Sequence, residues 1–399
     1  MKFKEVFLVT FMIFLASCST SDDGDMGYDS ELESAEAKAM VLTNNTFALD
    51  FFKEISKDGE AENYMVSPLS LSMALGMTYN GADGDTESAF GDVLGYEDVD
   101  GANKFNQKLM KSLMADGSGA RLNLANAIWI RNDFPVERDF VAVNKTFYNA
   151  EVDNLDFSDV KAVEVVNKWA YDHTKGKIDK LIEEFDNSTV LFLANALYFK
   201  GTWKFEFKPS DTEQAAFHTS NGTAQVPMMA MSATVPHFTN DTFSSIILPY
   251  KNDRYQMAVF LPHEDFDTND IVADLSMKNL GNWLERYTER GLDIKLPKFK
   301  KEYENELNDE LANMGLGIAF SSNADFGKIN SEALLRISKV FQKTFIEVNE
   351  EGTEAAAVTG VEIIMTSGTP SFVVNRPFLY MIRDSYTGSI CFMGRVGRP

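Results

Sequence analysis

The residue types that most often carry enzymatic chemistry are present in this chain but are not spaced for it. No GxSxG, HExxH or phosphate-binding glycine loop occurs in the 399 residues. The histidines are scattered without the spacing of metal ligands, at His173, His218, His237 and His263. We therefore expect a protein that is not an enzyme and that binds neither a metal nor a cofactor.

A different kind of chemistry is indicated by residues 350–370, EEGTEAAAVTGVEIIMTSGTP. Every second residue from Thr353 to Met365 is uncharged, whereas Glu354 and Glu362 fall on the opposite parity. This alternation is typical of a strand with one buried face. Such a pattern is unusual in a long loop without turn or helix signals, and loops of that length are usually functional.

The N-terminus is typical of an export signal. A short positive start precedes the apolar run 6–16, which is shorter than the roughly 20 residues that span a bilayer. The run ends in Leu15-Ala16-Ser17-Cys18, which resembles the lipobox of bacterial lipoproteins. The resemblance implies that residues 1–17 are a signal peptide and that Cys18 is lipidated. An ordinary signal peptide with an incidental cysteine is the alternative.

A polar, acidic stretch follows and predicts a tether over residues 18–43. An acidic patch after a lipidated cysteine resembles surface-export signals of Bacteroidota lipoproteins. We therefore expect a chain that is lipid-anchored to the bacterial outer membrane and faces the periplasm or the cell surface. Cys391 is the only other cysteine, so no disulfide is expected, and its apolar surroundings predict a small buried side chain.

Composition predicts a globular domain over residues 44–399. The hydrophobic fraction is 44% and the charged fraction 24%. The net charge of −23 argues against nucleic acid as a partner. Three lysines, Lys104, Lys108 and Lys111, share one predicted helix face, which we interpret as solvated.

Helical and strand-like segments alternate along this domain and predict a mixed α+β fold. A helix is expected over 46–57, and a second from Pro68 to Met77 with Ser67 as its cap. Strands are expected over residues 122–130, 190–198, 245–248 and 256–261.

Several segments together resemble the serpin family. The residues at 350–357 resemble the hinge of inhibitory serpins, and further matches extend from about residue 44 to the end: 63–82, 193–203, 296–299, 324–326, 375–378 and 392–396. The resemblance implies an α+β serpin fold with several β-sheets, a bundle of about eight or nine helices and an exposed reactive-centre loop at about 350–370.

The resemblance also implies roles for particular residues. The hinge comprises Glu350, Gly352, Thr353, Ala355, Ala356 and Ala357. The breach, where a loop begins to enter the main sheet, comprises Gly201, Trp203 and Lys298. The shutter comprises Ser67, Ser70, Asn195 and Gln342. An ion pair between Glu350 and Lys298 is a candidate hinge contact, with two solvated charges as the alternative.

One position departs from the family pattern. Gln342 occupies the place where the family usually has a shutter histidine. An amide can donate a hydrogen bond to Ser67 or Asn195, but it does not titrate. Any pH-sensitive opening that depends on that histidine is therefore in doubt for this chain.

The implied activity is inhibition of serine proteases by a suicide mechanism. Spacing in the family places the scissile bond at Thr366-Ser367, with cleavage after Met365 as the alternative. The protease would form a covalent acyl complex, and the cut loop would insert into the main sheet. No Lys or Arg lies between Glu354 and Phe372, which favours elastase-like or subtilisin-like targets over trypsin-like ones.

Other readings stay open at this stage. Papain-like cysteine proteases are possible targets, and a non-inhibitory carrier, chaperone or storage protein of serpin fold is the alternative function. We expect a monomer. Replacing Thr353 with Arg is expected to bury a charge during insertion, so that the variant is cut normally but releases active protease.

Overall fold

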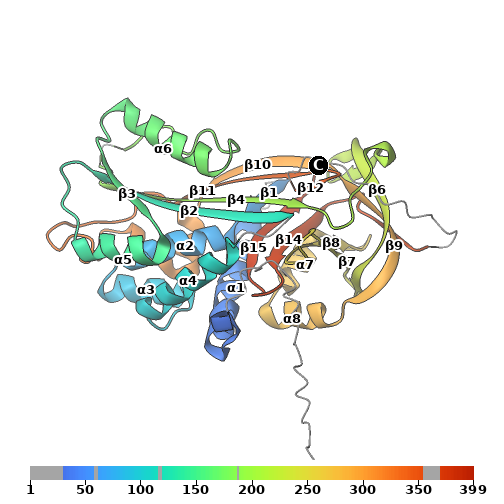
Figure 1. Cartoon of the computed structure of the whole chain (residues 1–399), viewed down its shortest axis with the longest axis horizontal. Coiled ribbons are helices and arrows are strands. Elements are labelled where there is room, and N and C mark those ends of the chain that lie inside the picture. The colour runs from blue at the N-terminus through green and yellow to red at the C-terminus, as the bar shows by residue number, and fades with distance from the viewer. Residues whose placement is uncertain (1–29, 58–61, 116–118, 187, 354–368) are drawn as a thin grey trace, which may run out of the picture.

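A computed structural model describes residues 30–57, 62–115, 119–186, 188–353 and 369–399 of the chain. The described ranges contain nine α-helices (Figure 1). They are α1 (Ala35–Ser56), α2 (Pro68–Tyr79), α3 (Gly84–Leu94), α4 (Val99–Leu113), α5 (Arg138–Tyr148), α6 (Val160–His173), α7 (Thr268–Asp274), α8 (Met277–Glu285) and α9 (Asn308–Leu311). None of these helices has both the length and the apolar character needed to span a bilayer.

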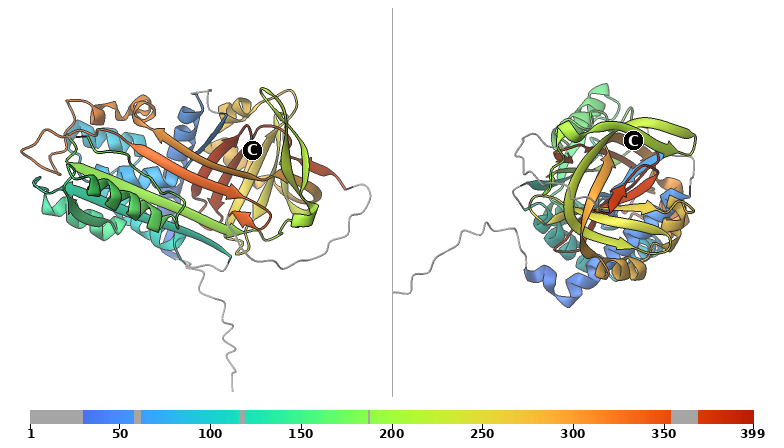
Figure 2. Two further views of the ribbon diagram at one scale, coloured as in Figure 1. Left: turned by 90° about the horizontal axis from the view of Figure 1, so that it is seen from above. Right: turned by 90° about the vertical axis from the view of Figure 1, so that its right-hand side faces the viewer.

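The strands of the described ranges form two sheets. The six-stranded sheet has the order β10-β11-β12-β4-β2-β3. Its strands are β2 (Ala120–Arg131), β3 (Glu151–Leu155), β4 (Leu191–Thr202), β10 (Phe299–Glu306), β11 (Phe341–Val348) and β12 (Gly352–Thr353). Strands β4 and β11 run side by side along the molecule, and β12 enters between them at one end (Figure 2).

The nine-stranded sheet has the order β1-β15-β14-β8-β7-β6-β9-β13, with β5 paired to β6. Its strands are β1 (Asn63–Val66), β5 (Glu213–Thr219), β6 (Gly222–Thr239), β7 (Phe243–Pro249), β8 (Tyr255–Pro262), β9 (Thr288–Pro297), β13 (Ser371–Val373), β14 (Phe378–Asp384) and β15 (Ile390–Val396). Helix α6 covers one face of the six-stranded sheet and α2 packs on the opposite face (Figure 1).

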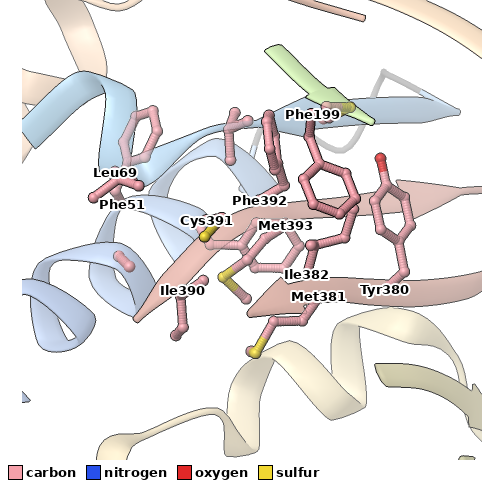
Figure 3. Packing of buried hydrophobic residues seen from close by; sticks show 14 of the residues in the cluster. Phe51, Leu69, Phe199, Tyr380, Met381, Ile382, Ile390, Cys391, Phe392 and Met393 are labelled. Carbon is pink, nitrogen blue, oxygen red and sulfur yellow. The ribbon is translucent and has the colours of Figure 1, made fainter. Parts of the chain in front are cut away.

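The main core lies where α1, α2 and the six-stranded sheet meet the hairpin β14–β15. Phe392 and Phe199 lie close together there, with ring centroids 6.4 Å apart (Figure 3). Cys391 is fully buried in this cluster, and burial raises the pKa of its thiol. The prediction that Cys391 is a small buried side chain is confirmed. A second cluster, including Trp129 and Trp169, joins α6 to the sheet.

The fold class predicted from the sequence is confirmed, and so is the start of α2. Pro68 is its first residue, and the Ser67 hydroxyl accepts a hydrogen bond from the amide of Ser70. The four predicted strands correspond to β2, β4, β7 and β8. Each ends one to four residues later than predicted; β2, β7 and β8 begin one or two residues earlier, and β4 begins one residue later.

Helical structure starts before residue 44, where the sequence predicted the beginning of the domain. Helix α1 begins at Ala35, and its Ser34 cap accepts a hydrogen bond from the amide of Ala37. Ala37 and Val41 are buried in the core, and Leu32 before the helix is buried as well. The helix begins about nine residues before the predicted domain. Its start was not predicted because the residues around it are acidic and were interpreted as part of a tether.

Candidate functional site at the loop hinge

The described part of the hinge includes a two-residue strand, β12, which lies between β4 and β11. In strand β12, Gly352 pairs with Thr202, and Thr353 pairs with Gly201, both antiparallel. On its other edge Thr353 pairs with Val348 of β11. The first residue of the predicted inserting face therefore already occupies a position inside the sheet.

Two glycines allow this close approach. Gly352 has φ of +150°, and a Cβ on it would lie 2.0 Å from the carbonyl oxygen of Gly201. A Cβ on Gly201 would in turn lie 2.5 Å from the ring of Tyr250. Neither contact can be relieved by a side-chain rotation alone, since one partner is backbone and the other a packed ring.

Trp203 and Tyr250 support the hinge through a stacked pair of rings and through hydrogen bonds. Their rings stack with centroids 4.6 Å apart at an angle of 12°. The indole Nε1 of Trp203 donates to the carbonyl of Asn349 at 3.0 Å, and its backbone amide donates to that of Glu351 at 2.9 Å. Trp203 thus holds the chain on both sides of Glu350.

Tyr250 was not anticipated from the sequence. Its hydroxyl lies 2.7 Å from the Thr353 hydroxyl, and both side chains are buried. Burial raises the pKa of Tyr250 well above its ordinary value, so the phenol stays neutral and able to donate. The only sequence signal was its position two residues after the predicted strand 245–248, which is part of β7.

The predicted ion pair at the hinge is present. Lys298 Nζ lies 2.7 Å from Glu350 Oε2, and the Thr212 hydroxyl donates to Glu350 Oε1 at 2.8 Å. Burial alone would raise the pKa of Glu350. The hydrogen bonds from Lys298, the backbone and Thr212, together with the charge of Lys298, outweigh burial and lower that pKa. The carboxylate is therefore charged at neutral pH.

Gln342 takes part in the shutter through both atoms of its amide. Its Nε2 donates to the carbonyl of Ser67 at 2.8 Å, and its Oε1 accepts from the amide of Ser67 at 2.9 Å. Of the two predicted acceptors for this amide, Ser67 is therefore the one that is bonded. The Ser67 hydroxyl donates to the carbonyl of Cys391 at 2.9 Å, which ties α2 to β15.

Asn195 belongs to a neighbouring branch of the same polar region. Its carbonyl oxygen accepts from the hydroxyl of Ser70. Its amide donates to Asn126 at 2.6 Å, and Asn126 donates to the carbonyl of Tyr148 at 2.7 Å. These bonds connect α2, β4, β2 and α5 behind the sheet, and Asn126 is a contributor that sequence reasoning missed.

The seam between β4 and β11 is unpaired along most of its length. Strand β4 pairs with β2 over eleven residues on one edge, whereas its other edge pairs only at Gly201 and Thr202. Strand β11 pairs with β10 over its full length and on the seam side only at Val348. Among the described residues, the facing edges below β12 thus have no ladder partner.

Several predicted site residues lie outside the described residues. They are Cys18, Ala355, Ala356, Ala357, Met365, Thr366 and Ser367. The chain resumes at Thr369 and forms β13, which pairs in parallel with residues 293–295 of β9 in the other sheet. The predicted reactive-centre loop is therefore attached to the six-stranded sheet at one end and to the nine-stranded sheet at the other.

Comparison with known proteins agrees with this geometry. The family model described as serpin (serine protease inhibitor) matches residues 42–399. The chain belongs to the serpin family. Glia-derived nexin of Rattus norvegicus is 35% identical over 363 residues, covering 88% of this chain and 91% of that protein. Membership in a family of protease inhibitors fits the expectation of a protein that is not an enzyme.

Solved serpin structures share the whole architecture. The thermophilic serpin tengpin in its native state has a TM-score of 0.83 and 29% identity, covering 93% of this chain and 95% of that one. Human thyroxine-binding globulin, complexed with thyroxine, has a TM-score of 0.85 and 29% identity, covering 92% and 100%. The same fold therefore occurs in a protein solved with thyroxine bound.

Proposed function

We propose that this serpin inhibits serine proteases as a suicide substrate. The protease serine attacks the carbonyl of Thr366, the bond to Ser367 breaks, and an ester joins the two proteins. The segment from Thr353 to Met365 then enters the seam between β4 and β11. Thirteen residues at about 3.3 Å each span about 43 Å, so the attached protease is carried far from its starting position.

The register of β12 carries this proposal. Continuing its two pairings along both neighbours puts Ala355 opposite Phe199 and Ile346, and Ala357 opposite Leu197 and Thr344. Thr359 then falls between Asn195 and Gln342, two of the shutter residues. The partners Phe199, Ile346, Thr344 and Gln342 are all buried.

This register agrees with the charge pattern of the loop. Residues directly opposite each other in an antiparallel pair place their side chains on the same face. The uncharged odd-numbered loop residues therefore share the core face of the sheet, while Glu354 and Glu362 share the other face. An odd-numbered charge would have to be buried without a partner.

The energetics favour insertion only narrowly. About a dozen new ladder hydrogen bonds contribute about 1 kcal/mol each. Ordering the same residues costs about 1 to 2 kcal/mol apiece. Burial of the uncharged face must supply the remainder, which makes small, uncharged side chains near the hinge important.

The target class follows from the residues around the proposed scissile bond. Thr366 is small and β-branched and suits a shallow primary pocket, so we propose elastase-like or subtilisin-like proteases. Chymotrypsin-like cleavage after Met365 is the second choice, and papain-like cysteine proteases are a third. A trypsin-like protease, whose primary pocket contains a buried carboxylate, would find no Lys or Arg between Glu354 and Phe372 to bind there.

The test is incubation with pancreatic elastase or subtilisin, followed by denaturing electrophoresis. We expect a band that survives boiling, at the summed mass of both proteins less the peptide 367–399. Mass spectrometry should identify that released peptide as beginning at Ser367. Clean cleavage with full recovery of protease activity would contradict inhibition. A peptide that begins at Thr366 would move the scissile bond by one residue.

A non-inhibitory carrier remains the second candidate, because thyroxine-binding globulin shares this fold. The hinge argues against that candidate, because the odd-numbered residues proposed to face the core are Thr353, Ala355 and Ala357. None of these is bulky or charged. Clean cleavage in the electrophoresis test would favour the carrier.

We also propose that Cys18 is lipidated and anchors a monomer to the outer membrane. The support is the apolar run followed by the lipobox-like residues 15–18. In a bacterial host, the wild type is expected in the membrane fraction and Cys18→Ser in the soluble exported fraction. A membrane-bound Cys18→Ser variant would contradict anchoring through this residue.

A further inference from the structure

A row of lysines crosses the exposed face of α4. Lys104, Lys108 and Lys111 are spaced by four and three residues, which places them on one side of the helix. Lys104 and Lys111 are exposed, while the opposite side of α4 is buried in the core through Phe105 and Leu109. On a chain of net charge −23, these three lysines place positive charge on this side of α4, with Asp100 one turn before Lys104.

The N-terminal segment joins the body beside this row. Glu31 Oε2 lies 2.7 Å from Lys108 Nζ, the middle lysine. The next residue, Leu32, is 7% exposed and belongs to the main core. Because Leu32 is buried in the core and Glu31 is paired with Lys108, the described part of the chain begins beside α4.

The residues just before this point have the complementary charge. Asp22, Asp23, Asp25 and Asp29 lie within residues 19–29, a stretch that contains no Lys or Arg. Asp25 is six residues from Glu31 and can reach about 20 Å. The row from Lys104 to Lys111 is about 10 Å long, so this short segment can reach both of its ends.

We propose that residues 22–29 dock along the lysine row of α4. Docking continues the contact that Glu31 already makes, and it holds the N-terminal segment against the body as a strap. It would cover the cationic face against other anions. It would also shorten the free length between residue 18 and the folded domain, and so turn α4 toward whatever carries residue 18.

The strap is expected to be sensitive to salt. Each exposed Asp–Lys pair is weak by itself. The pairs act together because the segment is covalently joined to the body, which keeps its local concentration high. Screening within about 8 Å at physiological ionic strength weakens them further, and about 0.5 M salt should release the segment.

Zero-length crosslinking tests the docked arrangement directly. The full chain, purified in mild detergent, is treated with a water-soluble carbodiimide, which condenses a carboxylate with an amine and loses water to the reagent. We expect amide links from Asp22, Asp25 or Asp29 to Lys104 and Lys111, and loss of these links in 0.5 M salt. Links scattered over all exposed lysines would overturn the proposal.

Matched variants provide a second measurement. Lys104→Gln with Lys111→Gln removes both ends of the row but leaves Lys108 and its Glu31 contact. Lys161→Gln with Lys168→Gln removes two exposed lysines at the same seven-residue spacing on α6.

A zinc endopeptidase that cuts before aspartate reports how accessible the segment is, without engaging an inhibitor of serine proteases. We expect the α4 variant to be cut several-fold faster within residues 22–29, and the α6 variant to be cut at the wild-type rate. Equal rates in all three proteins would overturn the proposal. It would equally fail if the lysines become protected only when phosphatidylglycerol vesicles are added, because the row would then bind a membrane surface.

Discussion

Gly201 and Gly352 are the residues at which two backbones approach too closely for a side chain. The carbonyl of Gly201 occupies the space that a Cβ on Gly352 would need. Both glycines lie at the end of the seam where β12 enters. The seating of Thr353 in the sheet therefore depends on the absence of a methyl group at either position.

Replacing Gly352 with Ala is expected to displace β12. The matched control is Gly222→Ala, because Gly222 also has a positive φ, +129°, but no atom within 4 Å of its Cβ position. Hydrogen exchange at the amide of Trp203, which is bonded to Glu351, should speed up at least tenfold in Gly352→Ala and stay unchanged in Gly222→Ala. Unchanged protection in Gly352→Ala would show that the hinge tolerates the methyl group.

Glu350 supplies a prediction about pH. Its pKa in the folded protein is lowered, so the stabilisation by its charged form is complete above the ordinary value of about 4.3. That stabilisation is lost as the pH falls through the lowered pKa. Glu350→Gln should therefore destabilise the native state by about 1 to 3 kcal/mol at pH 7, with a difference from wild type that narrows in acid.

The measurement is urea denaturation at pH 7 and near pH 3. Glu347→Gln, near the end of β11 and three residues before Glu350, is the control, since Glu347 is partly exposed and its lysine contacts are long, at 3.7 and 3.9 Å. It should cost less than about 1 kcal/mol. A Glu350→Gln penalty that is the same at both pH values would rule out the ionic contribution.

Gln342 shows what single residues reveal before a structure is known. The sequence predicted that its amide replaces the family's histidine and cannot titrate, and the structure shows both of its atoms bonded to Ser67. Tyr250 and Asn126 could not be found in this way. They contact the hinge and the shutter only through packing between strands distant in sequence, and neither lies in a segment that resembled the family.

At the scale of elements, β4 and β11 define a seam that one more strand can fill. Thr353 is already buried before any cut, so Thr353→Arg would disturb the intact protein as well as insertion. That substitution is therefore a less specific test than the sequence suggested. Positions farther along the loop separate the two effects.

Ala357→Arg and Val358→Arg form the matched pair for this purpose. In the proposed inserted form, the register of β12 would turn residue 357 toward the core beside Leu197 and Thr344, and would turn residue 358 to the opposite face. Both variants should be cut at the wild-type rate. Ala357→Arg should release most of the protease in active form, whereas Val358→Arg should keep a larger share in the covalent complex.

The readout is the ratio of covalent complex to cleaved inhibitor on denaturing gels. Equal ratios for the two variants would contradict the parity of the inserted strand. If neither variant nor the wild type forms a complex, inhibition itself is contradicted.

Element boundaries were predictable where local signals were strong. The cap at Ser67 and the proline after it fixed the start of α2. Helix α1 was predicted about eleven residues too late, because the acidic residues before it gave no reason to expect that Ala37 and Val41 are buried. Two-residue β12 has no local signal at all, since its strand geometry is imposed by β4 and β11.

At the scale of the whole molecule, the proposed form after cleavage would have one more paired strand than the native form. Two sheet edges are open along the seam, and the cut loop would close them. We expect the chain cut once between residues 354 and 368 to unfold at a temperature at least about 10 °C higher than the intact chain. Calorimetry measures this gain.

Ala357→Arg, cut in the same way, is the control and should gain much less. A cut wild type no more stable than the intact chain would show that the loop stays out of the sheet. Only the fold, which the family model and the sheet order establish, would then remain.

The seated Thr353 has a kinetic consequence. When two strands pair, formation of the first pair of residues is the slow step. Later residue pairs form quickly because each adds to an existing end. Here the first pair exists before the protease arrives, so the nucleation step is already complete. Insertion of the cleaved loop should therefore proceed in one direction, from the hinge toward the cleaved bond. The time that insertion takes, and not the time needed to start it, would then compete with hydrolysis of the proposed ester.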